Sequence, residues 1–200
     1  MHMAERLSQI LDHFEIARAH LCGFDMGGQP TLVFAAMHRE RCVSLTVMNS
    51  LVYGDSATSW EIALLRKFRF NRVALRHFPK LIFHRAEQTF LPSGVNLPEA
   101  LRQDLWEAFR RPEVRRYISK MCAGYQGYLP RVPALYEIIQ CPTLTLWAEE
   151  DKHFPRPQAE ELHRAIAASK LMFLPDAGHW MPWYRAPEVA SEIERFLAAL

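Results

Sequence analysis

Residues 21–28 read Leu21-Cys22-Gly23-Phe24-Asp25-Met26-Gly27-Gly28, an apolar run that ends at a carboxylate set between glycines. The pattern predicts a sharp strand-to-helix turn that projects the Asp25 side chain outward. Gly23 and Gly27 each stand two residues from Asp25, and we expect a side chain at either position to collide within so tight a bend. An outward-facing side chain at such a turn is well placed to act as a nucleophile.

Two later segments each combine a short apolar strand with titratable residues at its end. Residues 142–151 read Pro-Thr-Leu-Thr-Leu-Trp-Ala-Glu-Glu-Asp, and residues 174–180 read Leu-Pro-Asp-Ala-Gly-His-Trp. The chain therefore carries a nucleophile at Asp25, an acid among residues 149–151 and a histidine at His179, in that order. Because the carboxyl ends of parallel strands meet at one edge of a sheet, we expect these side chains to converge.

This order of segments resembles the α/β-hydrolase family, in which nucleophile, acid and histidine follow strands in the same sequence. The resemblance covers about residues 4–50 and about residues 140–200. An aspartate at the nucleophile position, where serine is usual, is similar to the branch that contains epoxide hydrolases and haloalkane or haloacetate dehalogenases. The family pattern of tryptophan, a small residue, two variable residues and aspartate matches residues 147–151, which favours Asp151 over Glu149 and Glu150 as the acid.

The resemblance implies an α/β fold with a parallel sheet flanked by helices. Residues 1–53 and 134–200 form the expected core, and residues 54–133 form a helical lid inserted after the second strand. Several strands precede the nucleophile strand in the family, whereas here only one predicted helix precedes residue 17. We therefore expect an N-terminally reduced sheet with an open edge. The chain is then a fragment of a longer protein, or a second copy or a completing chain covers the edge, or the sheet is natively reduced.

Composition predicts a soluble enzyme domain. The 200 residues are 50% hydrophobic, enough for one substantial core, and the formal net charge of +2 indicates neither a nucleic acid nor a membrane as partner. No apolar run approaches the roughly 18–20 residues of a spanning helix, and the first residues lack the apolar core of a signal peptide, which predicts a cytoplasmic protein. The four cysteines do not have metal-site spacing, and we expect neither a metal nor a cofactor.

A carboxylate nucleophile restricts the reaction. Attack of Asp25 on an ester carbonyl gives an anhydride, whereas attack on an sp³ carbon that bears a halide or an epoxide oxygen gives a stable alkyl-enzyme ester. The resemblance implies that His179 then activates a water that cleaves this ester, while Asp151 orients the imidazole. Asp176 lies three residues before His179 and is interpreted as a turn former.

The predicted lid is rich in phenylalanine, which favours a small apolar organic substrate. Met26 follows the nucleophile where haloalkane dehalogenases usually carry tryptophan, so it offers only a backbone N–H, and an epoxide is favoured over a halide. Opening an epoxide requires a proton donor, and Tyr128 or Tyr125 is the predicted donor from the lid. Trp180, next to His179, is a further predicted substrate-binding residue.

Two other functions stay open at this point. In the first, an ancestral serine became Asp25 and left a catalytically silent scaffold that binds a ligand or a partner. In the second, the open sheet edge belongs to an assembly domain that another chain completes. The joint presence of Asp25, Asp151 and His179 favours an enzyme over a silent scaffold, whereas the missing strands favour the assembly domain.

Overall fold

A parallel sheet of four strands forms the centre of the protein. The computed structural model describes residues 2–54 and 68–200, so residues 55–67 of the predicted lid lie outside the described residues. Across the sheet the strands follow the order β1 (Ala19–Phe24), β2 (Cys42–Met48), β3 (Thr143–Ala148) and β4 (Ser169–Leu174), and each neighbouring pair is parallel. The predicted α/β class is therefore confirmed.

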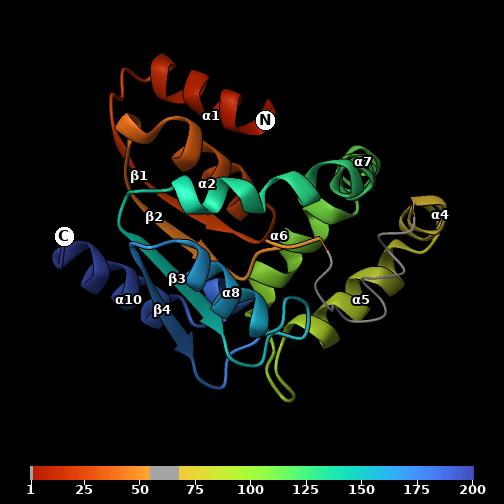
Figure 1. Ribbon diagram of the computed structural model, residues 1–200. Helices are drawn as coiled ribbons and strands as arrows, with labels where there is room; N and C mark the ends of the chain where they lie inside the picture. Colours follow the sequence, from red (N-terminus) through yellow and green to blue (C-terminus); the bar gives the residue numbers. More distant parts are fainter. Residues whose placement is uncertain (1, 55–67) are drawn as a thin grey trace.

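Helices cover the sheet and form a second group between β2 and β3. The helices that flank the sheet are α1 (His2–His13), α2 (Gly28–Met37), α8 (Pro157–Ala165), α9 (Met181–Tyr184) and α10 (Ala186–Ala198). The second group, called the helical group below, consists of α4 (Phe68–His77), α5 (Pro79–Phe90), α6 (Glu99–Phe109) and α7 (Pro112–Tyr128). Figure 1 shows the helical group beside one end of the sheet.

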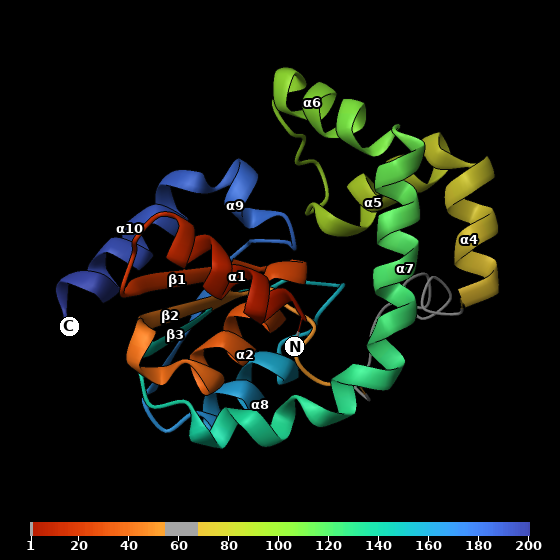
Figure 2. The same cartoon turned by 90° about the horizontal axis from the view of Figure 1, so that it is seen from above.

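Alternation along the strands builds a core on each face of the sheet, because successive side chains of a strand point to opposite faces. Leu45 and Val47 of β2 and Trp147 of β3 belong to one buried cluster, whereas Met48 and Leu146 belong to the other. Helices α1, α2 and α8 contribute to the first cluster, and α9 and α10 to the second. Figure 2 shows α2 and α8 on the opposite side of the strands from α10.

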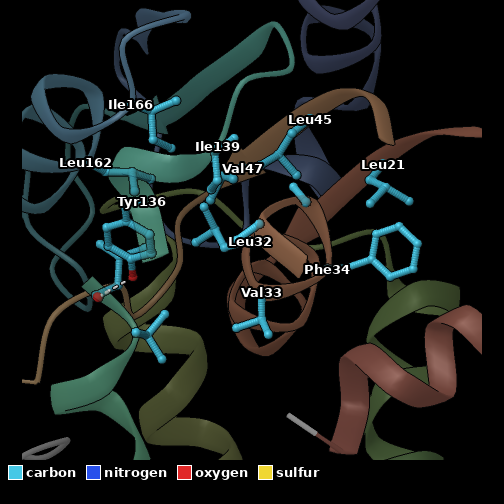
Figure 3. Close-up of a cluster of buried hydrophobic side chains, with 14 of the residues drawn as sticks. Leu21, Leu32, Val33, Phe34, Leu45, Val47, Tyr136, Ile139, Leu162 and Ile166 are labelled. Carbon is cyan, nitrogen blue, oxygen red and sulfur yellow. Dashed lines mark hydrogen bonds between the residues drawn. The ribbon is translucent and has the colours of Figure 1, made fainter. Parts of the chain in front are cut away.

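Helix α2 is the most deeply buried helix on the first face. Its residues Leu32, Val33 and Phe34 have no solvent exposure, as expected for a helix that is apolar on every side. Figure 3 shows Leu32 beside Val47 of β2 and Phe34 beside Leu21 of β1. This packing fixes the start of α2 against the sheet, and with it the turn that carries Asp25.

Strand β1 lies at one edge of the sheet, where β2 is its sole partner strand among the described residues. Pairing of this edge with a second copy or a completing chain stays a prediction. Within residues 2–54 and 68–200, no helix has the length and apolar character needed to cross a membrane.

The turn between β1 and α2 holds Asp25 in a left-handed backbone conformation, with a φ of 49°. The Ser50 hydroxyl donates to the Asp25 carbonyl oxygen at 2.6 Å and ties the turn to the end of β2. A Cβ at Gly23 would lie 2.6 Å from the Gly27 carbonyl oxygen and 2.8 Å from the Gly28 Cα, which confirms the collision expected at Gly23.

The same expectation is wrong for Gly27, where a Cβ would meet nothing within 4 Å. The second crowded position is Gly28, where a Cβ would collide with the Ser50 side chain. The turn therefore needs glycine at positions 23 and 28, because these two approach backbone and side-chain atoms closely, while position 27 faces open space.

Gly23→Ala and Gly27→Ala form a matched pair that tests this account of the turn. We expect Gly23→Ala to lower the free energy of unfolding by about 1–3 kcal/mol, because the added methyl meets backbone atoms that cannot move aside cheaply. Gly27→Ala should change it by less than about 0.5 kcal/mol. Urea denaturation of both variants measures the difference, and equal stabilities would contradict the packing described.

Candidate active site

Asp25, Asp151 and His179 lie together at the carboxyl ends of β1, β3 and β4. Nδ1 of His179 lies 2.9 Å from Oδ2 of Asp151, a hydrogen-bond distance. On the other side of the ring, Nε2 lies 4.0 Å from Oδ1 of Asp25, too far for a direct hydrogen bond. The structure thus brings together the three residues of the predicted catalytic set, with the imidazole between two carboxylates.

The Asp151 carboxylate is fully enclosed and has partners on both oxygens. Oδ1 accepts the backbone N–H groups of His153 at 2.7 Å and Phe154 at 2.9 Å, which leaves Oδ2 for His179. A buried carboxylate is tolerated when its oxygens are satisfied in this way. The loop after β3 therefore fixes both the position and the direction of the acid.

The competing acids lie elsewhere. Glu149 and Glu150 are exposed, and Glu149 pairs with Arg156 at 3.2 Å. Asp176 has a left-handed backbone, with a φ of 53°, in the turn after β4. Of the acids near the end of β3, the structure brings Asp151 to the histidine.

The His179 ring is completely buried, and this burial opposes a positive charge. Burial lowers the pKa of His179, but the charge and hydrogen bond of Asp151, with a further contribution from Asp25, prevail and raise the pKa from 6.5 to about 9. Aromatic rings surround the imidazole, with the Phe90 and Phe154 centroids 4.8 Å and 5.3 Å away. The imidazole therefore lies in apolar, aromatic surroundings, yet the two carboxylates favour its positively charged form.

A buried asparagine that sequence reasoning missed joins the ends of three strands. Asn49 directly follows β2, and its Nδ2 donates to the His179 carbonyl oxygen at 2.9 Å. Its Oδ1 accepts the Ala148 N–H at the end of β3, at 2.8 Å. Asn49 has a φ of 38°, a left-handed conformation in which asparagine is enriched. The available signal was a polar pair, Asn49 and Ser50, immediately after a buried apolar strand.

An apolar cavity of about 340 Å³ lies beside Asp25. Its walls come from the turn after β1, from the helical group and from the loops after β3 and β4. Apart from Asp25 and His153, the described lining side chains are apolar or aromatic. They are Met26, Leu51, Leu75, Ile82, Phe83, Ala86, Phe90, Leu105, Ala108, Phe109, Val114, Ile118, Cys122, Phe154 and Trp180. Met26 and Trp180, which the sequence analysis expects at the site, both line the cavity.

A backbone hydrogen bond connects the helical group to the loop that carries His179. The backbone N–H of Trp180 donates to the Phe90 carbonyl oxygen at 3.1 Å. A Cβ at Gly178 would lie 2.8 Å from that same oxygen and 3.0 Å from Cδ of Pro92. The end of α5 therefore packs against the histidine loop so closely that only glycine fits at position 178.

His153 is a second residue that sequence reasoning missed. It is buried, it lines the cavity, and its ring centroid lies 4.8 Å from that of His179. It stands two residues after Asp151, on the same loop whose backbone holds the acid. A histidine at this short spacing from the predicted acid was the signal available in the sequence.

Of the two predicted tyrosine donors, Tyr128 is not among the described residues that line this cavity. Tyr128 lines a different pocket, beside His2, Met3 and Gly124, and burial raises the pKa of its hydroxyl. It lies at the C-terminal end of α7, beside the start of α2, whereas residues nearer the start of α7 line the cavity. Tyr125 also lies in α7, but its side chain is outside the described part of the structure.

Two enzymes with carboxylic acid substrates are similar to this chain in sequence. The 2-hydroxy-6-oxo-6-phenylhexa-2,4-dienoate hydrolase of Comamonas testosteroni is 29% identical over 187 residues, which cover 92% of this chain and 64% of that protein. The 2-hydroxy-6-oxononadienedioate/2-hydroxy-6-oxononatrienedioate hydrolase of Klebsiella pneumoniae subsp. pneumoniae is 26% identical over 200 residues, 98% of this chain and 67% of that protein. The chain thus spans about two thirds of these relatives. Their names differ from the epoxide hydrolase and dehalogenase branch expected from Asp25.

Solved structures agree on the fold. The 2-hydroxy-6-oxo-6-phenylhexa-2,4-dienoate hydrolase from Rhodococcus sp. strain RHA1 superposes with a TM-score of 0.81 at 22% identity, covering 98% of this chain and 69% of that one. A lipase-like structure from Acinetobacter baumannii AYE gives a TM-score of 0.81 at 19% identity, covering 98% and 66%. The family model described as alpha/beta hydrolase fold matches residues 1–186. The chain therefore belongs to the alpha/beta hydrolase fold family.

Proposed function

We propose that this chain is a hydrolase that uses Asp25 as its nucleophile and acts on small, neutral, apolar molecules with an electrophilic sp³ carbon, epoxides before alkyl halides. One observation carries the proposal: Oδ1 of Asp25 lies 4.0 Å from Nε2 of the buried His179, beside an apolar cavity of about 340 Å³. A nucleophile and a base at this separation are close enough to act in turn on one bound molecule.

In the first step an Asp25 oxygen attacks the carbon and forms an alkyl ester, while the carbon–oxygen bond of the epoxide breaks. The departing oxygen takes up a proton. This proton comes from water, and among the described lining side chains the N–H groups of His153 and Trp180 are able to donate hydrogen bonds to the departing oxygen. An epoxide is favoured over a halide because position 26 carries methionine, which leaves Trp180 as the one indole in the described lining.

In the second step water attacks the ester carbonyl of Asp25, and Nε2 of His179 accepts a proton from that water. The imidazole keeps the orientation that Asp151 imposes through Nδ1. Cleavage returns the Asp25 carboxylate and releases a diol. No cofactor enters these steps.

The described lining of this cavity favours a neutral substrate over the acids named for the sequence relatives. Those substrates are dienoates or dienedioates, which carry carboxylate groups. The described lining residues include no lysine or arginine, and Asp25 adds a negative charge, so these residues favour a neutral substrate over an anionic one. We therefore assign this chain to neutral substrates within the same fold family.

His179→Gln separates the two chemical steps. With an aryl epoxide such as styrene oxide, this variant should still form the ester but hydrolyse it at least about 10²-fold more slowly, because the general base is gone. Mass spectrometry of peptides should then find the adduct on Asp25. In the His179→Gln background, the adduct should be abolished by Asp25→Asn and unaffected by Asp176→Asn, which alters a nearby carboxylate outside the site.

A folded His179→Gln protein that stays unmodified with epoxides and with alkyl halides would exclude the covalent mechanism. A silent scaffold that binds apolar ligands would then be the better account. Thermal unfolding of each variant confirms that the comparison is made on folded protein.

Hydrolysis of the ester should depend on pH through His179. Only the neutral imidazole accepts a proton, and in the free protein its pKa is raised to about 9. Alkylation removes the Asp25 charge while Asp151 remains, so in the intermediate we expect a midpoint between 6.5 and about 9. The hydrolysis rate should rise with pH and level off above this midpoint, as measured by single-turnover decay of the adduct.

The choice of acid can be tested in the same assay. Asp151→Asn should slow hydrolysis about 10²–10⁴-fold, because the imidazole loses both its orientation and its charge partner. Glu149→Gln, which changes an exposed acid nearby, should leave the rate within twofold of the unmodified chain, by analogy with surface substitutions. Equal effects of the two substitutions, or a rate that falls as pH rises, would refute the assigned roles.

A further inference from the structure

Three side chains, two of which line the cavity, present metal-ligand atoms to one another. One carboxylate oxygen of Asp25, one nitrogen of His153 and one nitrogen of His179 all lie within 4.8 Å of each other. They come from three separate strand ends, after β1, β3 and β4, so the fold and not a local sequence repeat assembles them. The sequence analysis, which searched cysteine spacing, expects no metal and did not find this set.

Two observations indicate that the set suits a cation. Nε2 of His179 is buried without a hydrogen-bond partner and faces Asp25 at 4.0 Å. Its other nitrogen, Nδ1, is bound to the buried Asp151 carboxylate at 2.9 Å. A histidine that presents one nitrogen while a carboxylate holds the other is the usual arrangement of metal-binding histidines in proteins.

The local charge balance points the same way. Asp25 and Asp151 place two carboxylates around one imidazole, and the described lining residues of the cavity include no lysine or arginine. A divalent cation bound to Nε2 in place of a proton would neutralise this pair of charges. The donor set of two imidazoles and one carboxylate suits zinc and other first-row divalent metals better than magnesium or calcium, which prefer oxygen ligands.

We infer that Asp25, His153 and His179 form a binding site for one divalent transition-metal ion of the zinc class, oriented by Asp151. Atoms mutually within 4.8 Å can all lie within about 3 Å of a common point, so shifts on the order of 1 Å bring them to the about 2.0–2.2 Å of zinc bonds. The remaining coordination positions face the cavity, where water or a small ligand has access.

This inference is independent of the proposed reaction, because metal binding is measured without turnover. The two are linked in one respect: a metal bound to Asp25 and His179 takes the proposed nucleophile and base out of use. Zinc should therefore act as an inhibitor of any reaction that needs both as free groups.

The test is direct titration of the untagged, folded chain with Zn²⁺ by calorimetry, and with Co²⁺ by visible absorption. We expect one ion per chain. His153→Phe keeps an aromatic ring among Phe90 and Phe154 but removes the nitrogen, and it should weaken binding at least 100-fold. Asp151→Asn, which acts through His179, should weaken it about 10–100-fold.

His13→Ala removes an exposed histidine of α1 and serves as the matched control, with unchanged binding expected. Thermal unfolding without metal shows whether each variant is folded. If His153→Phe does not fold, Asp25→Asn takes its place and should also weaken binding at least 100-fold. Absence of one-to-one binding, or binding that both site variants retain, would overturn the inference.

Discussion

The buried contact between His179 and Asp151 constrains everything around it. An imidazole with no solvent exposure can share a proton with a carboxylate only if the carboxylate is itself satisfied, and two backbone N–H groups of the loop after β3 meet that condition. Asn49 then fixes the backbone of the histidine loop to the end of β3. The strand ends therefore cannot be positioned independently, since a shift in one leaves a buried polar group unpaired.

Much of this arrangement was predictable from sequence because it follows from chain order. Parallel strands with crossover helices bring their carboxyl ends to one edge, so Asp25, Asp151 and His179 had to be neighbours once the strands were recognised. The crowding at Gly23 was predictable for the same local reason. The expectation for Gly27 was wrong because spacing along the chain does not give the direction in which a side chain would point. Gly27 has the same spacing from Asp25 as Gly23, yet its direction in space is different.

The residues that were missed depend on tertiary contacts. Asn49 acts through hydrogen bonds to residues about 100 and 130 positions away, and the sequence of β2 does not predict these bonds. His153 becomes a site residue because the loop that wraps Asp151 turns its ring toward the cavity. Tyr128 was expected at the site because the lid returns to the sheet there, but α7 carries it past the cavity to the N-terminal side of α2.

The backbone hydrogen bond between Trp180 and Phe90 links the helical group to the loop that positions the catalytic imidazole. Phe90, the last residue of α5, accepts the backbone N–H of Trp180, which follows His179. Close packing at Gly178 leaves no room for a side chain between α5 and this loop. Displacement of this end of α5 would therefore also shift the loop that orients the His179 imidazole. The carboxyl end of α5 is therefore a part of the cavity wall whose position and the position of the imidazole depend on each other.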